Sequence, residues 1–218
     1  MRLNKYLALA TGMSRRAADN AIDDGRVLVN NKRPEQGIQI SDHDVVTLDG
    51  NVASPKQHVT IMLNKQIGYV CSRDGQGSKT IYDLLPESYY NLKPIGRLDK
   101  NSSGLLLLTN DGNLANELTH PSRQKVKIYE VTLNQPLQPL HRQMISDFGI
   151  ELEDGLSKFE LERRTDDDRD WIVAMHEGRN RQIRRTFKAL DYTVIKLHRT
   201  HFGPYILADL KPGKTKNI

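Results

Sequence analysis

The sequence is poor in cysteine and in long apolar runs, and each shortage excludes a class of protein. Its 218 residues include one cysteine, Cys71, so neither an intramolecular disulfide framework nor a cysteine-rich metal site is expected. No apolar stretch approaches the roughly 18 residues that a membrane span needs, and no apolar segment typical of a secretory signal follows Met1. We therefore expect a cytoplasmic protein with no membrane span.

Charge is plentiful and unevenly distributed. The formal net charge is +5, which favours a polyanionic partner. Arginine and lysine concentrate in residues 179–199, whereas residues 151–170 are acidic around three consecutive aspartates at 166–168. This segregation predicts a basic face directed at phosphate groups and a solvated acidic face elsewhere.

The first 50 residues have the pattern of a small separate module. Apolar residues recur at helical spacing from Leu3 to Ala10, and Ser14 is a candidate N-cap for a second helix. Residues 27–29 read as a strand, an Asn-Asn turn follows, and further strand positions are expected at Ile38, Ile40, Val45 and Val46. The expected module is therefore helix, helix and hairpin.

Residues 51–58 are polar and aperiodic, and we expect them to form a linker. The remainder, 59–218, mixes strand and helix patterns. Its expected elements are strands at 59–63, 128–133 and 171–175 and helices at 113–120 and 180–190. Such a mixture predicts an α+β domain with a mainly antiparallel sheet.

One carboxylate stands out for its context. Asp99 lies two residues after Arg97 and just before an Asn-Ser-Ser-Gly turn, which leads into the four leucines of 105–108. That run suits a strand buried on both faces. A carboxylate at the mouth of such a strand is well placed for nucleophilic or electrostatic chemistry. Spacing alone, however, favours an ordinary salt-bridged loop aspartate.

The wider pattern changes that interpretation. Gly-Arg-Leu-Asp at 96–99, followed by Ser-Gly-Leu-Leu-Leu-Leu-Thr-Asn-Asp-Gly at 103–112, closely resembles the catalytic motif of RNA pseudouridine synthases of the RsuA/RluB type, which modify ribosomal RNA. Further blocks that resemble the family lie at 63–72, 127–129, 177–185 and 197–203. Gln66 departs from the proline that usually follows the first motif's lysine, which removes a rigid turn setting and no chemical group.

The N-terminal module resembles the αL RNA-binding domain, first named from a small-subunit ribosomal protein. The matching blocks are 2–6, 14–18 and 25–32, in the family's order. A small helical domain with solvated arginines is the alternative. With this module included, the resemblance covers almost the whole chain and implies an α+β catalytic domain behind an αL domain.

The resemblance also implies roles for individual residues. Asp99 would be the catalytic carboxylate, Arg184 would keep it ionised, and Tyr129 would stack on the uracil and help remove its C5 proton. Arg97 would help hold the target nucleotide out of its stack, and Lys65 would touch RNA or support the active-site loop. The basic residues expected to contact RNA are Arg2, Lys5, Arg15, Arg16, Arg26, Lys32, Arg179, Arg181 and Arg185.

The implied reaction moves uracil from N1 to C5 attachment on the same ribose. It exchanges no electrons, so no cofactor or metal is implied. The resemblance leaves open whether Asp99 attacks C1′ covalently or stabilises positive charge there. We expect a monomer that acts on ribosomal RNA, and the sequence favours large-subunit RNA over small-subunit RNA as its target. The alternatives are a small-subunit synthase, a non-catalytic assembly factor that binds ribosomal RNA, or a fragment of an aminoacyl-tRNA synthetase.

Overall fold

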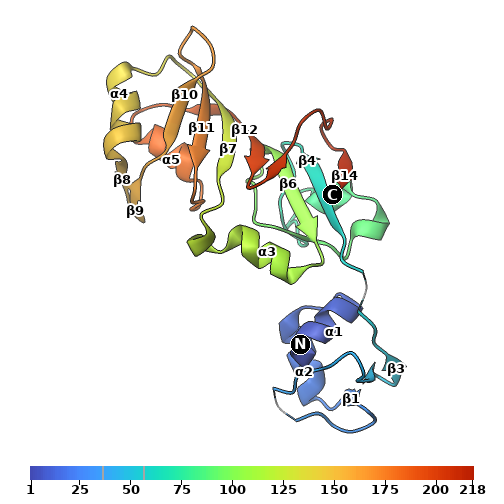
Figure 1. The fold of residues 1–218 in the computed structure, drawn as a ribbon. Helices are drawn as coiled ribbons and strands as arrows, with labels where there is room; N and C mark the ends of the chain where they lie inside the picture. Colours follow the sequence, from blue (N-terminus) through green and yellow to red (C-terminus); the bar gives the residue numbers. More distant parts are fainter. Residues whose placement is uncertain (36, 56) are drawn as a thin grey trace. The chain divides into compact units, whose positions relative to one another are not determined.

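The computed structural model describes residues 1–35, 37–55 and 57–218, and it divides into two compact units, Met1–Val59 and Thr60–Ile218 (Figure 1). Each unit has its own buried apolar core. No helix within the described residues is long and apolar enough to cross a membrane.

The smaller unit packs two short helices against a three-stranded sheet. Its elements are α1 (Leu3–Thr11), α2 (Arg15–Asp23), β1 (Val27–Val29), β2 (Val46–Leu48) and β3 (Asn51–Val52). The expected N-cap is confirmed, because the Ser14 side chain accepts a hydrogen bond of 3.0 Å from the Ala17 amide. Leu3, Leu7 and Val27 are buried in the core, so the helical spacing of the first residues does mark a packed face.

Two expectations for this unit need correction. Ile38, Ile40 and Val45 lie outside any strand, although Ile40 is buried in the core. The linker expected at 51–58 begins too early, because Asn51 and Val52 form β3 against β2 and Ala53 is buried. Lys56 lies outside the described residues. Polar composition suggested a linker here, but the antiparallel partner strand supplies the backbone hydrogen bonds that such a segment needs.

The larger unit is built on one twisted sheet. Its helices are α3 (Gly112–Thr119), α4 (Pro139–Gln143) and α5 (Gln182–Lys188), with a π-helical turn at Met144–Phe148 and 3-10 turns at Ile81–Leu84, Glu87–Tyr89 and Pro121–Arg123. Its strands are β4 (Thr60–Lys65), β5 (Lys93–Pro94), β6 (Ser103–Thr109), β7 (Lys127–Leu133), β8 (Ile150–Leu152), β9 (Gly155–Ser157), β10 (Glu160–Arg163), β11 (Asp170–Met175), β12 (Val194–Phe202), β13 (Tyr205–Ile206) and β14 (Thr215–Asn217).

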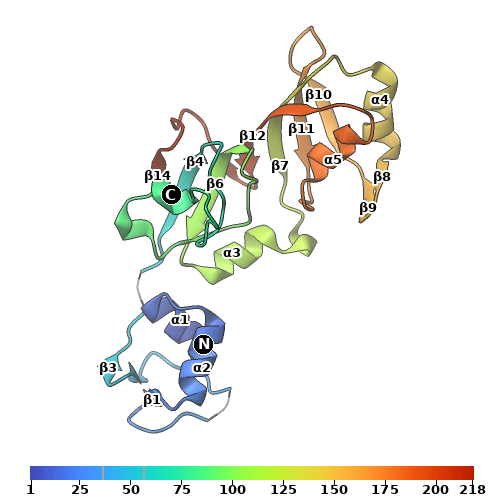
Figure 2. The same cartoon turned by 180° about the vertical axis from the view of Figure 1, so that it is seen from behind.

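The strand order of the main sheet is β10-β11-β7-β12-β6-β4-β14, with β13 and β5 paired to β12 and β6. Every pairing in it is antiparallel except β12 with β6. The α+β prediction is therefore confirmed. The hairpin of β8 and β9 lies with α4 and α5 beside β10 and β11, as both ribbon views show (Figures 1 and 2).

The leucine run forms the buried centre of this sheet. Leu105, Leu106, Leu107 and Leu108 are all fully buried in β6, as expected for a strand covered on both faces. β6 approaches β12 most closely at Gly104, where an added Cβ would lie 2.2 Å from the Arg199 carbonyl oxygen. Only glycine fits there. The short parallel pairing of β6 with β12 links the two halves of the sheet. This pairing lies beside the turn that carries Asp99.

Candidate active site

A cavity of about 880 Å³ opens beside that turn, within the larger unit. Asp99 lines it, together with Arg97, Tyr129, Arg181 and Arg199. The Asp99 side chain is 32% exposed, so its carboxylate is accessible from the cavity yet partly shielded from water. Three of the residues that the sequence predicted for one site, namely Arg97, Asp99 and Tyr129, do line the same cavity.

The turn at 98–102 is held by its main chain. All five of its carbonyl oxygens accept hydrogen bonds from outside the turn. The donors are the Cys71 thiol to Leu98 at 3.3 Å, Lys65 Nζ to Asp99 at 3.0 Å and to Ser102 at 2.7 Å, the Gly68 amide to Lys100 at 2.8 Å, and Arg184 to Asn101 at 2.7 Å. These bonds hold the backbone of the turn in place, so the Cα of Asp99 is held at the cavity.

Lys65 is the central support of the turn. Its side chain is fully buried at the end of β4, and Nζ donates to the carbonyls of Gln66, Asp99 and Ser102. Burial lowers the pKa of Lys65 to about 8, although the nearby Cys71 and Asp99 oppose this shift. All three ammonium hydrogens are directed at protein carbonyls. Of its two expected roles, contact with RNA is therefore excluded by burial and support of the loop agrees with the geometry.

Cys71 is hydrogen-bonded to the turn that carries Asp99. Its thiol donates to the Leu98 carbonyl, and the Leu98 amide donates back to the sulfur at 3.4 Å. Burial raises the pKa of the Cys71 thiol, so the thiol keeps the proton that it donates. No local pattern predicts this contact, because the two residues lie 27 positions apart.

The arginine beside the Asp99 carboxylate is Arg181, with 3.4 Å between its terminal nitrogen and Asp99 Oδ2. Arg184, which the resemblance placed there, instead donates to the carbonyls of Asn101 and Val194 at 2.7 and 2.8 Å. Burial lowers the pKa of Arg184 and the charge of Arg181 adds to this shift, whereas the charge of Asp99 opposes it. Arg184 therefore holds the turn's backbone within electrostatic reach of Asp99, and its expected role at the carboxylate stays a prediction. Arg181, expected to contact RNA, makes the direct contact with the carboxylate.

Tyr129 and Arg199 line the cavity from neighbouring strands. Tyr129 on β7 is 7% exposed and pairs across the sheet with Arg199 on β12. Arg199 is 2% exposed, donates from Nε to the Leu105 carbonyl at 2.8 Å and lies 4.8 Å from the centre of the Phe202 ring. A buried guanidinium makes this side of the cavity electropositive, which suits an ionised Asp99.

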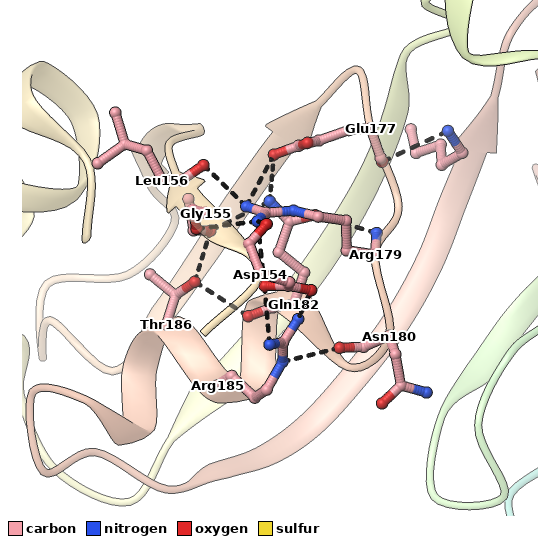
Figure 3. Close-up of polar contacts among 11 residues, drawn as sticks. Asp154, Gly155, Leu156, Glu177, Arg179, Asn180, Gln182, Arg185 and Thr186 are labelled. Carbon is pink, nitrogen blue, oxygen red and sulfur yellow. Dashed lines mark hydrogen bonds and ion pairs between the residues drawn. The ribbon is translucent and has the colours of Figure 1, made fainter. Parts of the chain in front are cut away.

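Two of the arginines expected to contact RNA are bonded within the protein. Arg179 donates to the carbonyls of Asp154, Gly155 and Leu156, and Arg185 binds the Asp154 carboxylate through both terminal nitrogens (Figure 3). Contact of this pair with RNA stays a prediction, although these donors are bonded within the protein. The acidic stretch is largely exposed, as expected, and its Asp154 also pairs with two arginines.

In the smaller unit, the residues expected to contact RNA lie mainly at the surface. Arg2, Arg15, Arg16 and Lys32 are exposed, and Lys5 is half-buried. Arg26 is also exposed, but it forms a two-point ion pair with Asp49, at 2.8 and 2.5 Å. An exposed pair of this kind adds little stability, yet it neutralises the Arg26 charge. Arg26 therefore adds less positive charge to this surface than the sequence suggested.

These features agree with comparisons to known proteins. A family model described as RNA pseudouridylate synthase matches residues 58–189, and a model described as S4 domain matches residues 1–46. The first match covers more than half of the chain. The chain belongs to the RNA pseudouridylate synthase family and carries an S4 domain at its N-terminal end.

Individual relatives extend the likeness over the full length. Ribosomal large subunit pseudouridine synthase B of Bacillus subtilis (strain 168) is 36% identical over 230 residues, covering all of this chain and 91% of that protein. An RNA pseudouridine synthase of Aquifex aeolicus (strain VF5) is 35% identical, with 100% and 90% covered. A crystal structure of a pseudouridylate synthase superposes with a TM-score of 0.71 at 30% identity, covering 100% of this chain and 96% of that one.

Proposed function

We propose that this pseudouridine synthase acts on ribosomal RNA, and specifically on the large subunit. The likeness to proteins named ribosomal large subunit pseudouridine synthase B, over all of this chain in Bacillus subtilis and 94% of it in Vibrio vulnificus, favours that target. The observation that carries the chemistry is the shared cavity of Asp99, Tyr129 and Arg181. We expect the protein to work as a monomer in the cytoplasm.

Asp99 would act at C1′ of the target ribose. The N1–C1′ bond must break, the uracil must turn, and a C5–C1′ bond must form before the C5 proton leaves. A fixed carboxylate can bond to C1′ or stabilise the positive charge that develops there. The turn at 98–102 presents the carboxylate from a backbone that is already held in place, and Arg181 lies 3.4 Å from Asp99 Oδ2, where it forms an ion pair with it.

Tyr129 and Arg97 would handle the base and its nucleotide. Tyr129 reaches the cavity from a buried strand, so its ring offers a rigid stacking surface and its phenol oxygen a site for the C5 proton. Arg97 is exposed at the cavity, where it can hold the extruded nucleotide. Extrusion costs a few kcal/mol, which contacts of this kind offset.

The S4 domain would supply part of the RNA affinity. Joint substitution of Arg2, Lys5, Arg15 and Arg16 by glutamine should weaken binding to a ribosomal RNA fragment and flatten its dependence on salt, because phosphate contacts release counterions. Arg26→Gln is the matched control, since that charge is already paired with Asp49. Unchanged affinity and slope in the fourfold variant would show that the S4 domain adds no phosphate contacts.

The target is tested by mapping pseudouridine in both ribosomal RNAs from cells that lack the gene. We expect one large-subunit position to lose its pseudouridine and regain it when the wild-type gene is restored, but not when the Asp99→Asn gene is restored. Loss at a small-subunit position would make the chain a small-subunit enzyme. If every pseudouridine persists, and the purified protein also leaves ribosomal RNA unmodified, a binding role in assembly would replace the proposed function.

A further inference from the structure

The hairpin of β8 and β9 contacts the arginine-rich segment 177–185, and one acidic residue, Asp154, forms ion pairs with two of its arginines (Figure 3). The Asp154 carboxylate accepts from the two terminal nitrogens of Arg185 at 2.9 and 2.6 Å, and from Arg179 at 3.0 Å. We call Asp154, Arg179 and Arg185 the Asp154 clamp. None of the chemical steps above uses these three residues, so their arrangement needs another explanation.

The hairpin backbone wraps around the Arg179 guanidinium. That group also donates to the main-chain carbonyls of Asp154, Gly155 and Leu156, at 2.7, 2.9 and 2.8 Å. Gly155 permits the wrap because its φ is +105°, a conformation that other residues rarely adopt. The Arg179 side chain is 21% exposed. Both terminal nitrogens of this guanidinium are bonded to the protein, and its buried Nε has no hydrogen-bond partner. The group therefore holds the chain in place and has little capacity left for RNA.

The segment between the two clamped arginines carries Arg181. Its φ is +47°, which is disfavoured for a residue with a side chain and persists only where the surroundings impose it. The surroundings do so here, because Arg185 also donates from Nε to the Asn180 carbonyl at 2.8 Å. The clamp therefore fixes the chain on both sides of Arg181, whose side chain is 47% exposed and reaches Asp99.

We propose that Asp154 is a positioning residue: by holding Arg179 and Arg185 it aims Arg181 at the Asp99 carboxylate. The proposal rests on the proposed function, because its measure is the rate of pseudouridine formation. The ion pairs keep the pKa of Asp154 below its usual value, with the Arg185 hydrogen bonds as the largest cause, so the carboxylate is charged wherever the enzyme is assayed near neutral pH.

The test is a double-mutant cycle with Asp154→Asn, Arg181→Gln and the double variant, assayed by single-turnover kinetics on an RNA that the wild type modifies. Asparagine keeps the shape and removes the charge. We expect Asp154→Asn to lower the rate by about tenfold to a hundredfold, since small misplacements cost that much, while RNA affinity changes by less than about threefold. If Asp154 acts through Arg181, the double variant should be no slower than Arg181→Gln alone.

Two further variants keep the test decisive. Asp166→Asn removes an exposed charge from the same acidic stretch and should keep the wild-type rate. Asp154→Glu retains the charge and should recover part of the rate, and it serves as the test variant should Asp154→Asn fail to fold. A wild-type rate in Asp154→Asn, or losses that simply add in the double variant, would overturn the proposal. An inactive wild type would instead defeat the proposed function.

Discussion

Two segments converge on the Asp99 carboxylate, and they are held in different ways. The turn at 98–102 is fixed through its main chain by donors that include the buried Lys65. The segment 177–185 is fixed through side-chain ion pairs to Asp154, which is 41% exposed. The two segments therefore have different tasks. The backbone of the turn, held by interior donors, positions the reacting carboxylate of Asp99, whereas ion pairs at the surface position Arg181 beside it.

This difference changes how a basic motif is interpreted. Of the four arginines at 179, 181, 184 and 185, three donate to groups of the protein that no reaction step uses. Only Arg181 reaches Asp99. Charge in such a motif therefore serves mainly to build the site, and its phosphate-binding capacity is smaller than its composition suggests.

The largest effect is expected where the interior support is removed. Lys65→Met should lower the free energy of unfolding of the larger unit by at least about 2 kcal/mol, because buried carbonyls lose their donor, and pseudouridine formation should fall with it. Urea denaturation and single-turnover kinetics measure the two effects. Lys211→Met, at an exposed lysine, is the control. A stable and active Lys65→Met protein would show that the turn needs no buried support.

The next contrast lies between Arg181 and Arg184. Arg181→Gln should slow the reaction by about a hundredfold with little change in melting temperature, because its side chain is exposed. Arg184→Gln should slow the reaction and also lower the melting temperature by about 4 °C, since two carbonyls lose their donor. Thermal denaturation and single-turnover kinetics of both variants measure this difference. Equal melting temperatures for the two variants would remove the distinction between them.

The smallest expected effect is the loss of the Asp154 ion pairs at low pH. The pKa of Asp154 lies below its ordinary value in the folded protein, so its ion pairs stabilise the segment above the unfolded pKa. That stabilisation is lost as pH falls through the folded pKa. Carboxyl carbon chemical shifts should therefore give Asp154 a titration midpoint below 3.8, and the midpoint should rise in Arg185→Gln. A midpoint at or above the ordinary value would mean that the clamp is open in solution.

The sequence predicted the elements whose signals are local. The helical spacing from Leu3, the Ser14 cap and the buried leucines of β6 follow from periodicity and capping chemistry. The family motif also indicated that Asp99 and Tyr129 share a cavity, although they are 30 residues apart by their numbers.

The rest depends on contacts between distant segments, which composition does not encode. Arg181 and Arg184 belong to the same basic motif, and the motif alone does not show that Arg181, whose backbone is left-handed, is the one that contacts the carboxylate. Asp154 was part of an acidic stretch with no visible partner. Its role emerges when the hairpin packs against residues that follow it by 25 to 31 positions.

The most direct test of the account is the yield of pseudouridine from Asp99→Asn on stoichiometric RNA that the wild type converts fully. Asparagine preserves the shape of the side chain, and the turn is held through its carbonyls, so folding and RNA binding should persist while no pseudouridine forms. Substantial pseudouridine from a folded, RNA-bound Asp99→Asn protein would contradict the assignment of the chemistry to Asp99.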